Sequence, residues 1–125
     1  MSNAIQSKIN KKEKIIESLI NNTDVLEMQF ESYRLKVSAF GYNVSLNDYR
    51  LEAFVEIIST DSQKLDNDYR VKITLYNDKG NIVGSNGYSI YGSEFNGLQT
   101  CEYNFYEDGI ALMVKKIRIF IVKEM

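Results

Sequence analysis

The stretch that decides the fold is residues 70–84, RVKITLYNDKGNIVG. Its first half alternates apolar and polar side chains, which is the pattern of a half-buried β-strand. The apolar face of this strand is formed by Val71, Ile73 and Leu75. Residues 77–80 (NDKG) are typical of a tight turn in which Gly80 takes the left-handed conformation. Because the apolar residues resume at 82–83, the stretch predicts a β-hairpin.

The same period-two alternation extends to both sides of the hairpin and predicts about seven short strands separated by turns. Besides the hairpin, alternation occurs over residues 26–30, 35–39, 51–57, 88–91, 99–106 and 113–123. This spacing is the signature of an antiparallel immunoglobulin-like β-sandwich. We expect a mainly β fold whose two sheets bury Val55, Ile57, Ile73, Leu75, Phe105, Ile117 and Ile119.

The dipeptide Asn86-Gly87 leaves two readings of the return strand. Asn-Gly is a strong signal for a two-residue hairpin turn, but the flanking residues 84–85 and 88–89 are poor strand anchors. A second hairpin so close to the first would leave a strand of about four residues, which is short for a globular protein. We therefore expect one bulged strand over residues 81–91.

Residues 1–22 have a different pattern from the rest of the chain. Apolar side chains recur there at helical spacing and form one stripe, with Ile5, Ile9, Ile16 and Ile20 at its centre. The sequence predicts one N-terminal amphipathic α-helix over residues 1–22, followed by the β-sandwich domain over 23–125. We expect this helix to pack on its own sandwich; pairing with a copy from another chain is the alternative, so the protein is a monomer or a homodimer.

Composition argues against most catalytic chemistry. The 125 residues include no histidine and one cysteine, Cys101. No Ser-His or Cys-His pair and no structural zinc site can be built from such a chain. We expect no enzyme activity, no catalytic residues, no cofactor and no bound metal. The acidic loop with Asp61, Asp66 and Asp68 leaves calcium open, although a solvated loop is the simpler reading.

Charge and hydropathy bear on partners and location. The net charge is −2, which disfavours nucleic acid, although Lys116 and Arg118 share a strand face with Phe120. No apolar window approaches the ~20 residues of a membrane span. The location stays unknown: cytoplasmic as the sequence is written, or the cell envelope if Ser2-Asn3-Ala4 is a tag remnant and the N-terminus was trimmed.

Nine tyrosines, with no tryptophan, are the remaining signal. Four of them fall where side chains should point outward or lie beside turns, namely Tyr76, Tyr88, Tyr91 and Tyr106. Tyrosine offers a large contact area at low entropic cost. These four residues are the candidate surface for a protein partner, and tyrosines that simply cover the core are the alternative.

The hairpin resembles the motif of the FxLYD domains of bacteria and archaea. Residues 73–77 (ITLYN) stand where that family has Phe-x-Leu-Tyr-Asp, and residues 78–84 (DKGNIVG) stand at its glycine turn and return strand. Ile73 replaces the phenylalanine and Asn77 replaces the aspartate. The similarity covers roughly residues 51–123, and it implies an immunoglobulin-like, non-catalytic module of the kind often attached to bacterial envelope proteins.

Two hypotheses for the function follow. The first is an interaction module that recognises a protein partner through a face or the loops of the sandwich. The second is a structural or accessory domain of a larger bacterial assembly that dimerises through the N-terminal helix. The residues name neither the partner nor the biological process, because a fold by itself does not imply a function.

Overall fold

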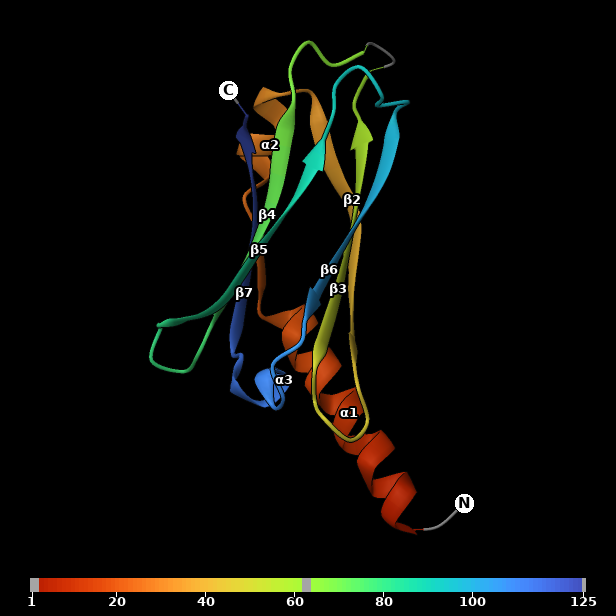
Figure 1. Ribbon diagram of the computed structural model, residues 1–125, viewed down its shortest axis with the longest axis vertical. Coiled ribbons are helices and arrows are strands. Elements are labelled where there is room, and N and C mark those ends of the chain that lie inside the picture. The colour runs from red at the N-terminus through yellow and green to blue at the C-terminus, as the bar shows by residue number, and fades with distance from the viewer. Residues whose placement is uncertain (1–2, 62–63, 125) are drawn as a thin grey trace.

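The structure, a computed structural model, describes residues 3–61 and 64–124. These residues form two β-sheets packed face to face, with a long helix at one end (Figure 1). The elements are, in chain order, α1 (Asn3–Asn21), β1 (Thr23–Val25), α2 (Glu27–Ser32), β2 (Leu35–Val44), β3 (Leu51–Ser59), β4 (Tyr69–Tyr76), β5 (Ile82–Ile90), β6 (Leu98–Phe105), α3 (Ile110–Met113) and β7 (Lys116–Lys123).

Seven strands make up the sandwich within these described ranges. One sheet has the strand order β1-β7-β4-β5 and the other has the order β2-β3-β6. The expected β-sandwich is therefore confirmed, but the expectation that it is wholly antiparallel was wrong, because β1 runs parallel to β7. The short exit from α1 sends the chain along β7 in the same direction, so that Ile117 N–H donates to the carbonyl of Asn22 (3.1 Å).

The predicted hairpin is formed by β4 and β5. The side-chain oxygen of Asn77 accepts hydrogen bonds from the backbone N–H groups of Lys79 (3.0 Å) and Asn81 (2.9 Å). Gly80 closes the turn with a φ of +79°, a conformation that favours glycine. The strand β5 then runs without a second turn through Asn86-Gly87, as expected, and its bulge lies at Val83, where the ladder register shifts.

The core lies between the two sheets. All seven side chains that were expected there are buried. Six of the seven come from β3, β4 and β7, and the seventh, Phe105, comes from β6. One polar group crosses the core: the hydroxyl of Tyr103 in β6 donates to the carbonyl of Val71 in β4 over 2.8 Å. This hydrogen bond joins the two sheets and satisfies a hydroxyl that would be costly to bury alone.

The helix α1 buries apolar side chains against the sandwich through its C-terminal half. In its N-terminal half, Lys8 donates to the Asn47 side-chain oxygen (3.2 Å) and Lys11 lies over the Tyr49 ring, both in the connection between β2 and β3. Leu19 is buried in the core, and the Thr23 hydroxyl ties the helix end to both the Leu19 carbonyl (2.6 Å) and the Tyr42 hydroxyl (2.7 Å). The N-terminal half extends past the ends of the strands (Figure 1), where Ile5 is 46% exposed. Packing within the chain is thus confirmed for the second half of the helix.

None of the helices in the described part of the chain is long and apolar enough to cross a membrane.

Two short helices, α2 and α3, were not expected. Residues 26–30 were predicted as a strand, yet Phe30 is buried while Met28 is 83% exposed. Residues two apart share a face of a strand but lie on nearly opposite sides of a helix, so the different exposure of these two side chains reflects the helix α2. The expected strand over 113–123 begins only at Lys116, because α3 takes up residues 110–113.

Candidate functional site

The sandwich has one side closed by helices and one side open. On the closed side, α1 packs against β2, and α2 contacts both β2 and β7. On the open side lie β5, the last strand of one sheet, and β6, the last strand of the other. Figure 1 shows no helix along the length of β5 in the described chain. The backbone at this edge is therefore the main candidate for a binding element.

The direction of the backbone groups in β5 follows from the ladder of the sheet. In β7, the backbone N–H and C=O groups of Ile117 and Ile119 point toward β1 and the residues beside it. Ile117 N–H donates to the Asn22 carbonyl, and the Ile119 carbonyl accepts from Leu26 N–H (3.0 Å). Alternate residues of a strand bond to opposite sides. The even-numbered residues of β7 and β4 therefore bond to each other, and the odd-numbered residues of β4 bond to β5.

This alternation leaves three residues of β5 with backbone groups that point away from β4, namely Ser85, Gly87 and Ser89. Gly87 supports the assignment, because its N–H donates to the side-chain oxygen of Asn86 (2.8 Å) and not to β4. Among the residues that the structure describes, the outward N–H and C=O groups of Ser85 and Ser89 make no hydrogen bond. These groups are available to an added strand.

The composition of β5 is unusual for an edge. Of the seven described strands, β5 alone, with the sequence IVGSNGYSI, has no charged residue, and it has no proline. The three other edges are protected: β1 carries Asp24, β6 carries Glu102, and β2 carries Lys36 and is covered by helices. Proteins block edge strands with charge, proline, bulges or covering elements because an open edge is a template for pairing. In β5 only the bulge at Val83 and the Asn86 side chain serve this purpose.

Positive charge lies beside this edge on the outer face of the sheet. Arg70 of β4 extends across Gly87, and a β-carbon at that glycine would lie 2.8 Å from the guanidinium carbon. The Arg70 Nη1 donates to the Ser89 hydroxyl (3.2 Å), which in turn donates to the Glu124 carboxylate (2.9 Å). A glycine at position 87 thus provides the space in which the arginine lies flat over the edge strand.

The four tyrosines predicted as a partner surface do not form one patch. Tyr88 is in β5, where its hydroxyl accepts from Gln99 (3.2 Å) and its ring meets that of Tyr103. Tyr91 follows β5 and is 51% exposed, whereas Tyr106 follows β6 at the opposite end and is 73% exposed. Tyr76 is paired with Ile82 and lies under the Arg118 guanidinium. Their role in binding stays a prediction.

Sequence reasoning missed the edge itself. It looked for side chains that make contacts, whereas the groups offered by β5 are backbone groups. The signal that was available is the absence of charge over residues 82–90, in a chain where 26% of residues are charged.

The acids of the 59–68 loop have protein partners. Arg34 binds Asp61 (3.4 Å) and Asp66 (3.8 Å), and the Asp68 carboxylate accepts from Gly92 N–H (2.9 Å). Calcium takes six to eight oxygen ligands, so other loops would have to contribute carboxylates. Asp78 and Asp108 follow β4 and β6, at the end of the sandwich opposite to this loop (Figure 1). The residues that the structure describes contain no group of three or more histidine, cysteine or carboxylate side chains that could hold a metal ion.

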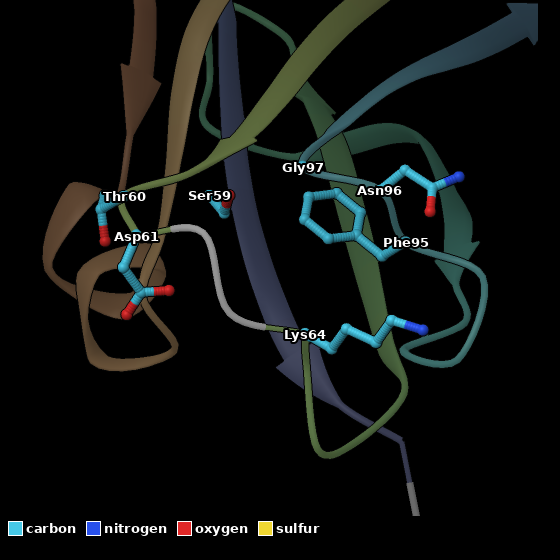
Figure 2. A pocket seen from close by; sticks show the side chains of 7 residues that line it. All are labelled: Ser59, Thr60, Asp61, Lys64, Phe95, Asn96 and Gly97. Atoms are coloured by element: carbon cyan, nitrogen blue, oxygen red, sulfur yellow. The ribbon is translucent and has the colours of Figure 1, made fainter.

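A hollow of about 610 Å³ opens at the same end as this loop. Figure 2 shows that it lies between the end of β3, with Ser59, Thr60 and Asp61, and the loop before β6. The buried ring of Phe95 forms one wall, and Lys64 extends along another. Because the Asp61 carboxylate is bound to Arg34, the described lining presents hydroxyl and amide groups together with the Lys64 ammonium, and it includes no histidine or cysteine.

Buried ionisable groups lie in the core and not in this hollow. Burial raises the pKa of the Cys101 thiol to about 12 and the pKa of the Tyr42 hydroxyl to about 12. Burial also raises the pKa of Tyr103, and the neighbouring Cys101 acts in the same direction. A thiol with so high a pKa is protonated at neutral pH and is a poor nucleophile. Cys101 therefore acts as a small apolar side chain of the core.

Comparisons with known proteins give matches among solved structures only. No protein-family model matches the chain, and no curated protein matches it. One similar solved structure is a DUF1425 family member from Shewanella sp. pv-4, with a TM-score of 0.49 and 14% identity over 73% of this chain and 79% of that chain. Another is Campylobacter jejuni cj0090, with a TM-score of 0.49 and 13% identity over 83% of this chain and 99% of that chain.

Proposed function

We propose that this protein is a non-catalytic interaction module that binds a protein partner by adding an extended segment of that partner to β5. The observation that carries this proposal is the uncharged edge with three outward-facing residues, Ser85, Gly87 and Ser89. Binding by strand addition draws its affinity from main-chain hydrogen bonds along such an edge. No helix of the described residues lies along β5 (Figure 1), which leaves room for the added strand.

We also propose that the module is immunoglobulin-like, and the order of most of its strands supports this. In an immunoglobulin sandwich, the first, second and fifth strands share one sheet, and the third and sixth share the other. Counted from β2, five strands follow this order, with β2, β3 and β6 in one sheet and β4 and β7 in the other. The fourth strand, β5, differs, because it lies beside β4 and not in the sheet of β2, β3 and β6. The place of the seventh strand, beside β7, is taken by β1. The FxLYD resemblance of residues 73–84 implies a module of the same general kind.

Ser85→Pro tests the proposal because proline at this position removes an outward N–H without touching the ladder to β4. Proline is tolerated on edge strands where its nitrogen faces solvent. A library of random nonapeptides displayed on phage is selected on the full chain, and one enriched peptide is then synthesised. We expect Ser85→Pro to weaken its binding about tenfold, while Ser85→Ala leaves it within about twofold. Calorimetry gives the affinities.

Hydrogen exchange of the bound chain is the second readout. The amides of Ser85 and Ser89 should exchange more slowly with peptide bound, and denaturant unfolding should show both variants folded. A peptide that binds Ser85→Pro as tightly as the unaltered chain, or that leaves both amides unprotected, would rule out strand addition at β5.

The second candidate function is an accessory domain of a larger bacterial assembly that dimerises through α1. The observation in its favour is the N-terminal end of α1, which extends past the strands (Figure 1) and leaves Ile5 46% exposed. A helix stripe of this kind gains stability when a second apolar surface covers it.

A charge placed on the stripe separates the two candidates. If α1 pairs with a second copy, the chain has twice its own mass in solution, and Ile5→Lys returns it to the monomer mass because a buried lysine is costly. Ser7→Lys adds the same charge to a neighbouring exposed position and should leave the mass unchanged. Sedimentation equilibrium measures the masses. A monomeric unaltered chain would contradict the second candidate.

A further inference from the structure

The Arg70 guanidinium is placed at the edge where the partner strand would lie. The Nη2 atom would be 3.0 Å from a β-carbon at Gly87, so the side chain covers the outer face of the edge strand itself. A strand added to β5 would lie about 4.8 Å from it. A side chain opposite Gly87 on the outer face would therefore come directly beside this guanidinium.

The charge of Arg70 is only partly neutralised. Its side chain is 42% exposed, and its Nη1 lies 3.9 Å from the Glu124 carboxylate, with the Ser89 hydroxyl bridging the two. A guanidinium has five N–H donors. Nε and Nη2 of Arg70 make no hydrogen bond or ion pair with the residues that the structure describes. These donors form the fork that binds a carboxylate through two hydrogen bonds.

A second cation extends the positive charge along the same row. Lys72 follows Arg70 by two residues, so both side chains are on the outer face of β4, and Lys72 is paired with Gly87. Within β5 no carboxylate balances them. Asp24, another acid on this face, is across the sheet and pairs with Arg118 (3.4 Å).

We propose that the segment added to β5 is acidic on its outer face, with an aspartate or glutamate opposite Gly87 bound by Arg70. This inference rests on the proposed function, since it names the chemistry of the strand that β5 receives. The added strand places alternate side chains on the outer face, so acids two residues apart would meet Arg70 and Lys72 in turn. The recognised class is an extended acidic peptide with apolar or small residues between its acids.

Three matched peptides test the inference on the full chain. The first is a nonapeptide from the phage selection, the second replaces its acids with glutamine, and the third replaces them with lysine. We expect the selection to enrich Asp or Glu at alternate positions, and we expect the acidic peptide to bind at least tenfold more tightly than the glutamine peptide. Arg70→Gln should remove most of this difference, and Arg70→Glu should make the lysine peptide the tightest.

The outcomes separate this inference from the proposed function. If acidic and glutamine peptides bind equally and Ser85→Pro weakens both, strand addition stands and the acidic preference is wrong. If the preference for acid is unchanged in Arg70→Gln, the assignment to Arg70 is wrong. If no peptide is enriched, or Ser85→Pro weakens none, the proposed function fails. Arg70→Lys serves as a control, since it keeps the charge but loses the fork, and denaturant unfolding confirms that each variant is folded.

Discussion

Replacing Leu75 with alanine lowers the free energy of unfolding by about 2–5 kcal/mol, the range measured for large-to-small changes in a filled core. Leu75 has no exposed surface. Its side chain lies against Gly84, where an added β-carbon would be 3.0 Å from the Leu75 Cδ1 atom. Because this packing is tight and lies between two sheets, the neighbours can move little to fill the space. Urea unfolding measured by circular dichroism gives the change.

Leu98→Ala is the matched control for this prediction. It is the same chemical change at a strand position where the side chain is 54% exposed, so we expect a loss of about 1 kcal/mol or less. Equal losses for the two variants would mean that Leu75 is not in a packed core, and the two-sheet arrangement would then be wrong.

We expect alkaline pH to destabilise the fold by about 5–6 kcal/mol between pH 7 and pH 11. The cause is the raised pKa of Cys101, Tyr42 and Tyr103, which stay neutral in the fold and ionise first in the unfolded chain. Unfolding therefore releases protons above the ordinary thiol pKa of 9.0. Each such group lowers the free energy of unfolding by about 1.4 kcal/mol per pH unit above its ordinary pKa, until the folded pKa near 12 is reached.

Urea unfolding at pH 7, 9, 10 and 11 measures this dependence. These three groups should leave the free energy of unfolding nearly constant below pH 9 and should lower it above pH 9. Cys101→Ala is the control, since it removes the group that titrates first, and its decline between pH 9 and 10 should be about 1 kcal/mol smaller. A profile that stays flat to pH 11, or a Cys101 that reacts with a thiol reagent in the folded protein at pH 8, would show that these side chains are not buried.

Local features of the fold could be predicted from the sequence. The β4–β5 hairpin depends on a turn whose residues, Asn77 and Gly80, act within five positions of each other. The core of β3 and β4 follows from alternation, which places every second side chain between the sheets. The single course of β5 through Asn86-Gly87 was also predictable, because poor flanking anchors argue against a second turn.

Other features depend on contacts between distant segments. The helix α2 has six residues, fewer than two turns, so its apolar positions resemble a strand as well as a helix. The parallel pairing of β1 joins Thr23 with Ile117, and no local pattern indicates it. The candidate site also depends on distant segments, because only the order of strands in the sheet makes β5 an edge. The lack of charge in β5 therefore indicates a binding edge only once that order is known.

The place of β1 beside β7 has a consequence for how the chain reaches this structure. Thr23 pairs with Ile117, although more than ninety positions separate them in the chain. In the order of synthesis β7 comes after the six other strands, and it lies between β1 and β4. Until β7 is available, β1 therefore has no strand to pair with in the four-stranded sheet, whereas β2, β3 and β6 can already pair with one another. Long-range pairing of this kind slows folding, so we expect the three-stranded sheet to form first and β1 to dock together with β7.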